Sequence, residues 1–236
     1  MDSVGKTHVG KVRKNNEDYY YVDGEGLYVL ADGMGGHLAG DVASKSAVDY
    51  IRSHFYDQSR FADLPAYLNE IVLGVNRYIY TLANSSDKYK DMGTTLIVAY
   101  VDAQQKMFYA HVGDSRLYLY RQGSLQRLTK DHSLVEELLS KGAITESEAQ
   151  SHPQKNIITR AIGVNEDVQV DIGCKPLEGG DVFLICTDGL SNMIADDNLR
   201  NILEAEQDIN TLADRLINEA NKNGGSDNIT VVIGKI

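Results

Sequence analysis

Eight short segments rich in Val, Ile, Leu and Tyr constrain the fold of this chain more than any other feature of its sequence. Turn residues such as Gly and Asp separate several of them, which is typical of β-strands. The segments are 19–22, 27–31, 94–101, 107–112, 116–121, 168–172, 182–186 and 229–236. The short connections predict an antiparallel meander, in which 107–112 pairs with 94–101 on one side and with 116–121 on the other.

Apolar residues at helical spacing lie between these segments. The longest example runs from Leu64 to Leu82, where apolar residues recur every three or four positions along one face. Shorter helices are predicted over residues 43–55, 134–139 and 212–220. Because helices and strands occur in blocks and not in strict alternation, we expect an α+β fold in which two mainly antiparallel sheets pack together with helices outside.

Composition narrows the class of protein. The chain of 236 residues is 42% hydrophobic and shows no repeat or linker, so we expect residues 1–236 to form a single domain. A formal charge of −11 argues against an extended surface for nucleic acid or anionic membranes. Cys174 and Cys186 form no CxxC motif and indicate no disulfide framework. Without an apolar signal segment or a membrane-spanning run, the sequence predicts a cytoplasmic protein.

Four aspartates stand at the ends of strand-like segments, each beside Gly or a small polar residue. They are Asp32 in LYVLADG, Asp114 in YAHVGDS, Asp188 in FLICTDG and Asp227 in NGGSDNITVV. Converging carboxylates repel one another unless a cation neutralises them, and all-oxygen ligation selects Mg²⁺, Mn²⁺ or Ca²⁺. The alternative interpretation is that each motif is only a turn. Four such motifs together favour a metal site. The site is neither an EF-hand nor a P-loop, because the spacings of those motifs are absent.

Motifs spread over nearly the whole chain resemble those of the PPM family, the metal-dependent type 2C serine/threonine protein phosphatases, in its compact bacterial form. In the family's order they are GKVRKNNEDYYYV (10–22), LADGMGGHLAGDVAS (30–44), MGTTL (92–96), HVGDSRLYLYR (111–121), LTKDHSLV (128–135), HPQKNIITRAIG (152–163), LICTDGLSNM (184–193) and GGSDNITVV (224–232). The resemblance implies a four-layer α-β-β-α sandwich with a dinuclear metal site at one end of its two sheets.

The resemblance also implies roles for four residues of the dinuclear site. Asp32 matches the carboxylate that bridges the two metal ions, and the carbonyl of Gly33 matches a ligand of one ion. Asp188 and Asp227 match ligands of the other ion. The expected ions are Mn²⁺ or Mg²⁺.

Three further acidic residues match outer parts of this centre. Asp114 is similar to the aspartate that, together with Asp188, holds a weaker third ion in bacterial members. Glu17 and Asp18 resemble an acidic pair that contacts the metal ions through water molecules.

The implied reaction is the hydrolysis of phosphoserine and phosphothreonine monoesters on proteins by a metal-activated bridging water, without a phosphoenzyme. Arg13 matches the arginine that receives the substrate phosphate, a task that suits its planar guanidinium. Taken alone, Arg13 resembles a basic surface residue beside Lys11 and Lys14. Many eukaryotic members carry a histidine two residues after the bridging aspartate, where this chain has Met34. His37 is the catalytic candidate instead: it donates a proton directly, acts through water, or only orders the glycine-rich turn.

Phosphorylated proteins are the expected substrates, and an opposing serine/threonine kinase is the expected partner. We expect a monomer that binds neither nucleic acid nor membranes. Residues 143–164 match the flap beside the family's active site, and within it Thr145 and Glu148 predict a capping box. Two alternatives stay open: a metal-dependent phosphatase of small phosphorylated metabolites, and a non-catalytic sensor on the same fold.

Overall fold

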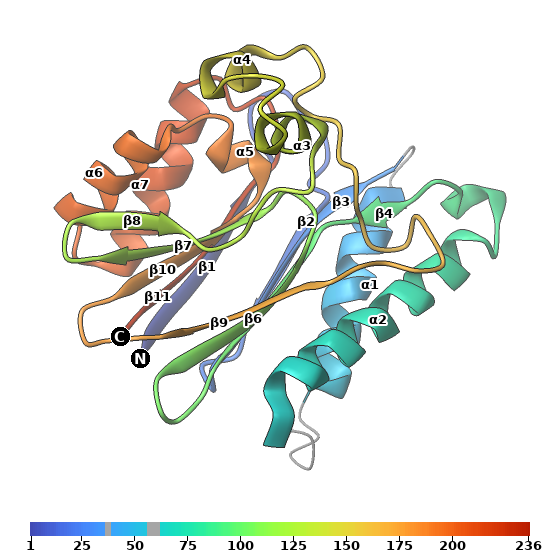
Figure 1. The fold of residues 1–236 in the computed structure, drawn as a ribbon, viewed down its shortest axis with the longest axis horizontal. Helices are drawn as coiled ribbons and strands as arrows, with labels where there is room; N and C mark the ends of the chain where they lie inside the picture. Colours follow the sequence, from blue (N-terminus) through green and yellow to red (C-terminus); the bar gives the residue numbers. More distant parts are fainter. Residues whose placement is uncertain (36–38, 56–61) are drawn as a thin grey trace.

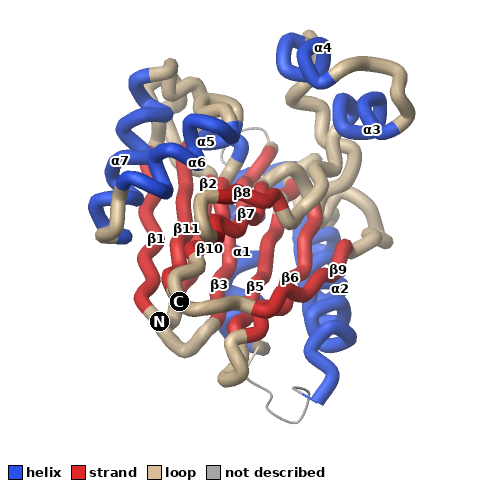
Figure 2. Tube along the Cα trace, turned by 60° about the vertical axis from the view of Figure 1, so that its left-hand side comes forward, coloured by secondary structure: helices blue, strands red, loops and turns tan. Residues whose placement is uncertain are grey.

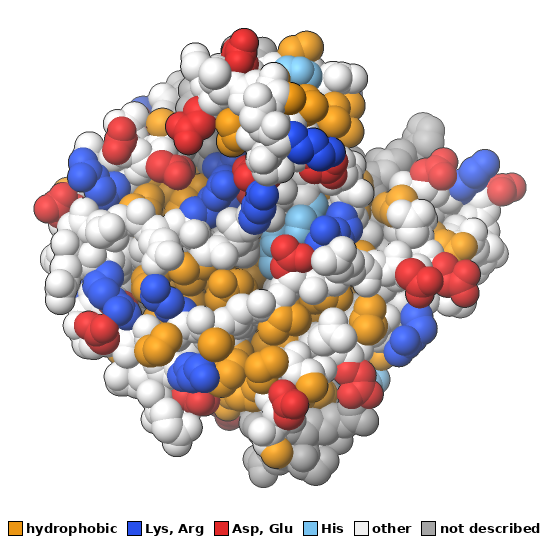
Figure 3. All heavy atoms as spheres, viewed as in Figure 1, with side chains coloured by type: hydrophobic (Ala, Val, Ile, Leu, Met, Phe, Trp, Pro, Cys, Tyr) orange, Lys and Arg blue, Asp and Glu red, His pale blue; other side chains and the backbone are white. Residues whose placement is uncertain are grey.

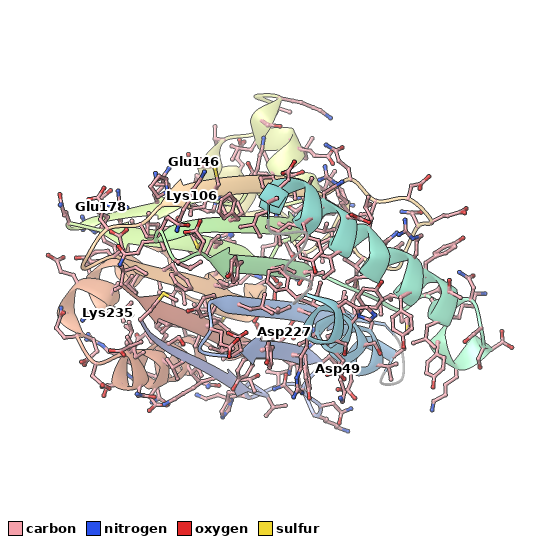
Figure 4. All side chains as sticks on the ribbon, turned by 90° about the horizontal axis from the view of Figure 1, so that it is seen from below. Asp49, Lys106, Glu146, Glu178, Asp227 and Lys235 are labelled. Carbon is pink, nitrogen blue, oxygen red and sulfur yellow. The ribbon has the colours of Figure 1, made fainter. Side chains whose placement is uncertain are left out.

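Two antiparallel β-sheets packed face to face form the centre of the protein, and helices cover both outer faces (Figure 1). The computed structural model describes residues 1–35, 39–55 and 62–236. Helices α1 (Ala39–His54) and α2 (Leu64–Ala83) pack on one sheet. Helices α6 (Asp196–Ala205) and α7 (Ile209–Lys222) pack on the other. The two pairs appear at opposite sides of the view from below (Figure 4), which confirms the predicted α-β-β-α layers.

Each sheet joins strands from distant parts of the sequence. In spatial order, the first sheet contains β1 (Asp2–His8), β11 (Ile229–Lys235), β10 (Val182–Cys186), β7 (Arg116–Arg121) and β8 (Ser124–Arg127). The second contains β2 (Asp18–Val22), β3 (Leu27–Met34), β5 (Leu96–Val101), β6 (Lys106–Val112) and β9 (Asp171–Pro176), with β4 (Gly93–Thr94) paired to the end of β3.

Alternation along the strands divides the apolar core into layers. In β3, Leu27 and Val29 face α1 and α2, whereas Tyr28 and Leu30 face the opposite sheet. The same alternation in β10 sends Phe183 between the sheets and its neighbours toward α6 and α7. The inter-sheet layer is therefore apolar along most of each strand. Polar side chains can enter this layer only at the strand ends, where the residues that face the opposite sheet are no longer apolar.

Three sequence-based strand predictions are wrong. Segments 107–112 and 116–121 do not pair, because β6 belongs to the second sheet and β7 to the first. Gly113, with φ of +114°, turns the chain from one sheet to the other. The predicted strand 94–101 is divided into β4 and β5. The last strand of the second sheet is β9 and not 168–172, because Val168 and Val170 pack against the helix-covered core before the ladder with β6 begins.

The flap segment contains a short helix and projects from the sandwich. Helix α4 (Glu146–Ser151) packs against α3 (Leu134–Ser140), and Figure 2 shows the pair standing apart from the sheets. The predicted capping box is confirmed, because Thr145 N–H donates to Glu148 Oε2 at 2.7 Å and Glu148 N–H donates to the Thr145 hydroxyl at 3.3 Å. Among the described residues, none of the helices has the length and apolar character that crossing a bilayer requires.

Candidate active site

One end of the inter-sheet core is polar. In β3, Leu30 faces the opposite sheet, and Asp32 is the next residue on that face. In β2, Tyr20 packs against the same core, and Asp18 precedes it on the same face. The antiparallel register places Asp18 directly opposite Asp32. Two of the predicted acidic residues therefore meet at the rim between the sheets.

The other three aspartates reach this rim from the first sheet and its connections. Asp188 is the first residue of α5 (Asp188–Ser191), which follows β10, and Asp227 lies just before β11 (Figure 4). Asp114 lies in the connection that crosses from β6 to β7. The side chains of Asp18 and Asp114 are buried, with 4% and 8% of their surface exposed.

Burial and like charge raise the carboxyl pKa values in this cluster. Burial, and then the carboxylates of Asp18 and Asp188, raise the pKa of Asp32 well above its usual range, with Asp114 and Asp227 adding to the effect. Burial is also the main cause that raises the pKa of Asp18 to about 7, of Asp114 to about 8 and of Asp188 to about 6. The five predicted aspartates thus lie close enough to repel one another.

Two buried oxygens of the cluster suit a cation. Oδ1 of Asp18 and Oδ1 of Asp114 have no hydrogen-bond partner among the described residues. Buried polar atoms are nearly always paired, and an ionised carboxylate oxygen can only accept a hydrogen bond or bind a cation. Since all the side-chain donors of the cluster are oxygens, its residues fit hard divalent ions such as Mn²⁺ and Mg²⁺.

Gly33 allows three backbone segments to meet beside Asp32. A Cβ at Gly33 would collide with the carbonyl oxygens of Gly40 and Glu17. The Gly33 N–H donates to Glu17 O at 3.0 Å, and the Ser44 hydroxyl donates to the same oxygen at 2.5 Å. The predicted carbonyl ligand is therefore held in a fixed backbone contact with the loop that carries Glu17 and with the start of α1.

Asn228 ties the loop that carries Arg13 to the beginning of β11. Its side-chain NH₂ donates to the carbonyl oxygens of Val9 and Asn15, at 3.0 and 2.9 Å. Its side-chain oxygen accepts from Glu17 N–H at 2.8 Å. This role of Asn228 was not predicted from the sequence, although the polar pair before a strand, in SDNITVV, is the signal that could have revealed it.

Arg13 reaches the carboxylate cluster. Its Nη2 donates to Oδ2 of Asp227 at 2.8 Å, while more than half of the side chain stays exposed. A guanidinium carries five N–H donors, so this contact leaves donors for a phosphate. Met34 is the last residue of β3. The predicted catalytic residue His37 lies outside the described residues.

Thr94 and Thr95 of the MGTTL segment support Asp32 directly. The Thr95 N–H donates to Asp32 O at 2.8 Å, and the Thr95 hydroxyl accepts from Asp32 N–H at 3.0 Å. The Thr94 hydroxyl also donates to Asp32 O, at 2.8 Å. The Thr95 hydroxyl also shares a hydrogen bond with Ser115 Oγ, 2.8 Å away. These contacts fix the backbone that carries the central carboxylate.

His111, His132 and Asp171 form a second group of potential metal ligands. Figure 3 shows histidine atoms near the centre of one face, beside acidic and basic side chains. Nδ1 of His132 accepts from Gly113 N–H at 2.9 Å, and Nε2 of the same ring lies 2.9 Å from Nη1 of Arg160. That Nε2 lies 3.2 Å from Asp171 Oδ2, while Arg160 donates to Asp171 Oδ1 at 2.7 Å. His132 and Asp171 thus already bind other protein groups, which favours a structural role for these two residues.

The same histidine fixes the turn before Asp114. The backbone N–H of His132 donates to Gly113 O at 2.8 Å, in addition to the ring contact with Gly113 N–H. Gly113 is thus held from both sides in its left-handed conformation. His132 also comes directly before Ser133, the N-cap of α3.

The raised carboxyl pKa values predict that the metal-free protein loses stability as pH rises. Between the unfolded pKa near 4 and the folded values of about 6 to 8, the native state binds more protons than the unfolded chain. The free energy of unfolding should therefore fall, by an amount on the order of a few kcal/mol, as pH rises across this range. Thermal melts in chelator from pH 5.5 to 8.5 measure the slope. Asp18→Asn should flatten it, and a Tm that does not fall in the wild type would contradict the prediction.

The chain is similar to known proteins over nearly its whole length. The sequence profile of the family described as "Protein phosphatase 2C" matches residues 4–231. The chain is 40% identical over 240 residues to "Serine/threonine phosphatase stp" of Listeria monocytogenes serovar 1/2a, covering 99% of this chain and 95% of that protein. The crystal structure of the Mycobacterium tuberculosis serine/threonine phosphatase PstP/Ppp is similar, with a TM-score of 0.91 and 37% identity over 98% of this chain and 97% of that one. The PstP catalytic domain in complex with two manganese ions has a TM-score of 0.89 and 35% identity over 98% and 96% of the two chains.

Proposed function

Because this chain belongs to the protein phosphatase 2C family and is a metal-dependent serine/threonine protein phosphatase, we propose that the aspartate cluster between its sheets is the catalytic centre. The observation that supports this most directly is the pair of buried, unpartnered oxygens on Asp18 and Asp114. The substrates of the enzyme are phosphoproteins, and we infer that a serine/threonine kinase phosphorylates the same proteins. Residues 1–236 are proposed to form one catalytic domain with a flap at 143–164.

The proposed cation site is formed by oxygen donors from both sheets. Its direct ligands would be Asp32, the Gly33 carbonyl, Asp188 and Asp227, with Glu17 and Asp18 in contact through water and Asp114, together with Asp188, at a weaker third ion. Cations bound in this way lower the pKa of a coordinated water and neutralise phosphoryl oxygens. We propose Mn²⁺ or Mg²⁺ as the native ions, and the manganese complex of PstP supports the first choice.

The chain's own residues would bind and orient the substrate phosphate. Arg13, held beside Asp227, would bind two phosphate oxygens through its planar guanidinium and hold phosphorus over the carboxylate cluster. Water, and not a side chain, would attack phosphorus, so no phosphoenzyme forms. The leaving serine or threonine oxygen needs a proton, which His37 would supply directly or through water.

Phosphate release from a phosphothreonine peptide tests this function. The purified protein should release phosphate with Mn²⁺, stop when chelator is in excess, and recover when Mn²⁺ is restored. A panel of nucleotides and sugar phosphates tests the small-metabolite alternative. A folded protein that binds Mn²⁺ and releases no phosphate from any of these compounds would instead be a sensor.

Arg13→Ala should lower kcat/KM for a phosphothreonine peptide by at least about tenfold, mainly through a higher KM. Hydrogen bonds to charged groups contribute about 1.5–3 kcal/mol. Because Arg13 would bind the phosphate in both the ground state and the transition state, losing this interaction raises KM more than it lowers kcat. Lys14→Ala is the matched control, because it removes a neighbouring positive charge from the same loop. If both variants keep the wild-type KM and kcat, Arg13 is only a surface residue.

Asp114→Ala should leave the two core cations bound and lower kcat by about tenfold or more. Asp114 lies in the crossing connection, apart from the β2–β3 pair that carries Asp18 and Asp32, so its loss should affect a third ion before the other two. Counting bound Mn²⁺ by calorimetry or anomalous scattering checks this expectation. A variant that loses both core ions would show that Asp114 belongs to the core site.

A further inference from the structure

The Asp18 carboxylate is held through one oxygen only. The Thr230 hydroxyl donates to its Oδ2 at 2.6 Å, and the Thr187 hydroxyl donates to the same atom at 3.0 Å. Its Oδ1 is buried and has no hydrogen-bond partner within the part of the chain that the structure describes. Both hydroxyls therefore donate to Oδ2, and Oδ1 remains available to a different partner.

Strand alternation explains why two threonines reach this point. Thr187 follows Ile185 of β10 on the inter-sheet face, and Thr230 precedes Val232 of β11 on the same face. The two strands are paired, and the Thr187 N–H donates to Thr230 O at 3.1 Å. Both hydroxyls thus lie at the rim where Asp18 enters from the opposite sheet.

The hydrogen-bond directions in this network are fixed. The Asp18 carboxylate, when ionised, can only accept hydrogen bonds, so Thr230 must donate its single hydroxyl proton to Asp18. The Thr7 hydroxyl, 2.7 Å from the Thr230 hydroxyl, must then be the donor, and it accepts in turn from Asn16 Nδ2 at 2.8 Å. Thr187 Oγ1 accepts from Thr230 N–H at 3.0 Å. The hydroxyl protons of Thr187 and Thr230 therefore both point at Asp18 Oδ2, an arrangement that favours the charged form of Asp18.

We propose that Thr187 and Thr230 are positioning residues that hold the Asp18 carboxylate so that its unpartnered Oδ1 faces the divalent cations of the site. This inference rests on the function proposed above. A purely structural network would be expected to satisfy both oxygens, since a partly satisfied buried group is costly. The network instead gives both hydroxyl protons to one oxygen and leaves the other buried and unpartnered, on the residue that lies opposite Asp32 in the strand register.

The test measures the affinity of the metal-free protein for Mn²⁺ by titration calorimetry. Thr187→Val and Thr230→Val remove the hydroxyls and keep the side-chain shape, and each should weaken Mn²⁺ binding by about 10- to 100-fold, as loss of outer-shell partners typically does. Thr187→Ser and Thr230→Ser keep the hydroxyls and should restore most of the affinity. Thr81→Val is the matched control, because the Thr81 hydroxyl donates only to Arg77 O on the exposed face of α2.

Folding is checked by circular dichroism and thermal melts in chelator before each titration. If Thr230→Val does not fold, Thr7→Val interrupts the same network one step further out and should weaken Mn²⁺ binding in the same direction. Folded Val variants with wild-type affinity would overturn the inference, and so would Ser variants as weak as the Val variants, because packing would then be the cause. A wild type that binds no Mn²⁺ would overturn the proposed function itself, so the two failures are distinguishable.

Discussion

Asp32→Asn should reduce turnover of a phosphothreonine peptide by at least about 100-fold, more than the 10- to 100-fold typical of losing an outer-shell partner. Asp32 lies opposite Asp18 in the strand register, and the charges of Asp18, Asp114, Asp188 and Asp227 all help to raise its pKa. Asn has nearly the same shape but carries no charge, and it cannot neutralise a second cation. Steady-state kinetics at saturating Mn²⁺ measure the loss.

The matched control is Asp49→Asn. Asp49 lies on α1, is about half exposed and pairs with Lys45 at 2.8 Å, a contact of a kind that contributes little to stability. This variant should keep wild-type kinetics. If Asp32→Asn retains more than about a tenth of the wild-type rate while binding Mn²⁺ normally, Asp32 is not the shared ligand and the dinuclear assignment is wrong.

Millimolar Mn²⁺ should raise the Tm of the wild type by about 5–10 °C. A ligand that binds only the folded state stabilises it by about 2.7 kcal/mol when its concentration is 100 times Kd, and each kcal/mol shifts the Tm of a domain of this size by about 2–4 °C. Neutralising the repulsion within the aspartate cluster is the physical source of this gain. Scanning calorimetry at fixed ionic strength measures the shift.

Asp32→Asn should lose most of this rise. Without metal, the same variant should be at least as stable as the metal-free wild type, because one of several repelling charges is removed. The two results together separate a cation site from a merely structural cluster. A wild type whose Tm does not respond to Mn²⁺ would contradict the cation site, whatever its activity.

The sequence predicted much of the fold and most of the candidate site because both depend on local patterns. The period of two along β3 is visible in the sequence, and it already places Asp32 on one face with Tyr28 and Leu30. The periodic spacing from Leu64 to Leu82 likewise predicted α2, which ends one residue later. The resemblance of the motifs also predicted that Arg13 belongs to the site, and Arg13 lies beside Asp227 in the structure.

Strand pairing and side-chain partners were decided only by the tertiary structure. The segments 107–112 and 116–121 look like a hairpin in the sequence, yet Gly113 and His132 direct the chain across to the other sheet and so bring Asp114 to the rim. Nothing in the local sequence marks Thr187, just after β10, or Thr230, in β11, until the pairing of these strands places both hydroxyls against Asp18. Alternation along a strand follows from local backbone geometry, whereas register and sheet membership depend on which distant surfaces exclude water together, and no short stretch of sequence contains that information.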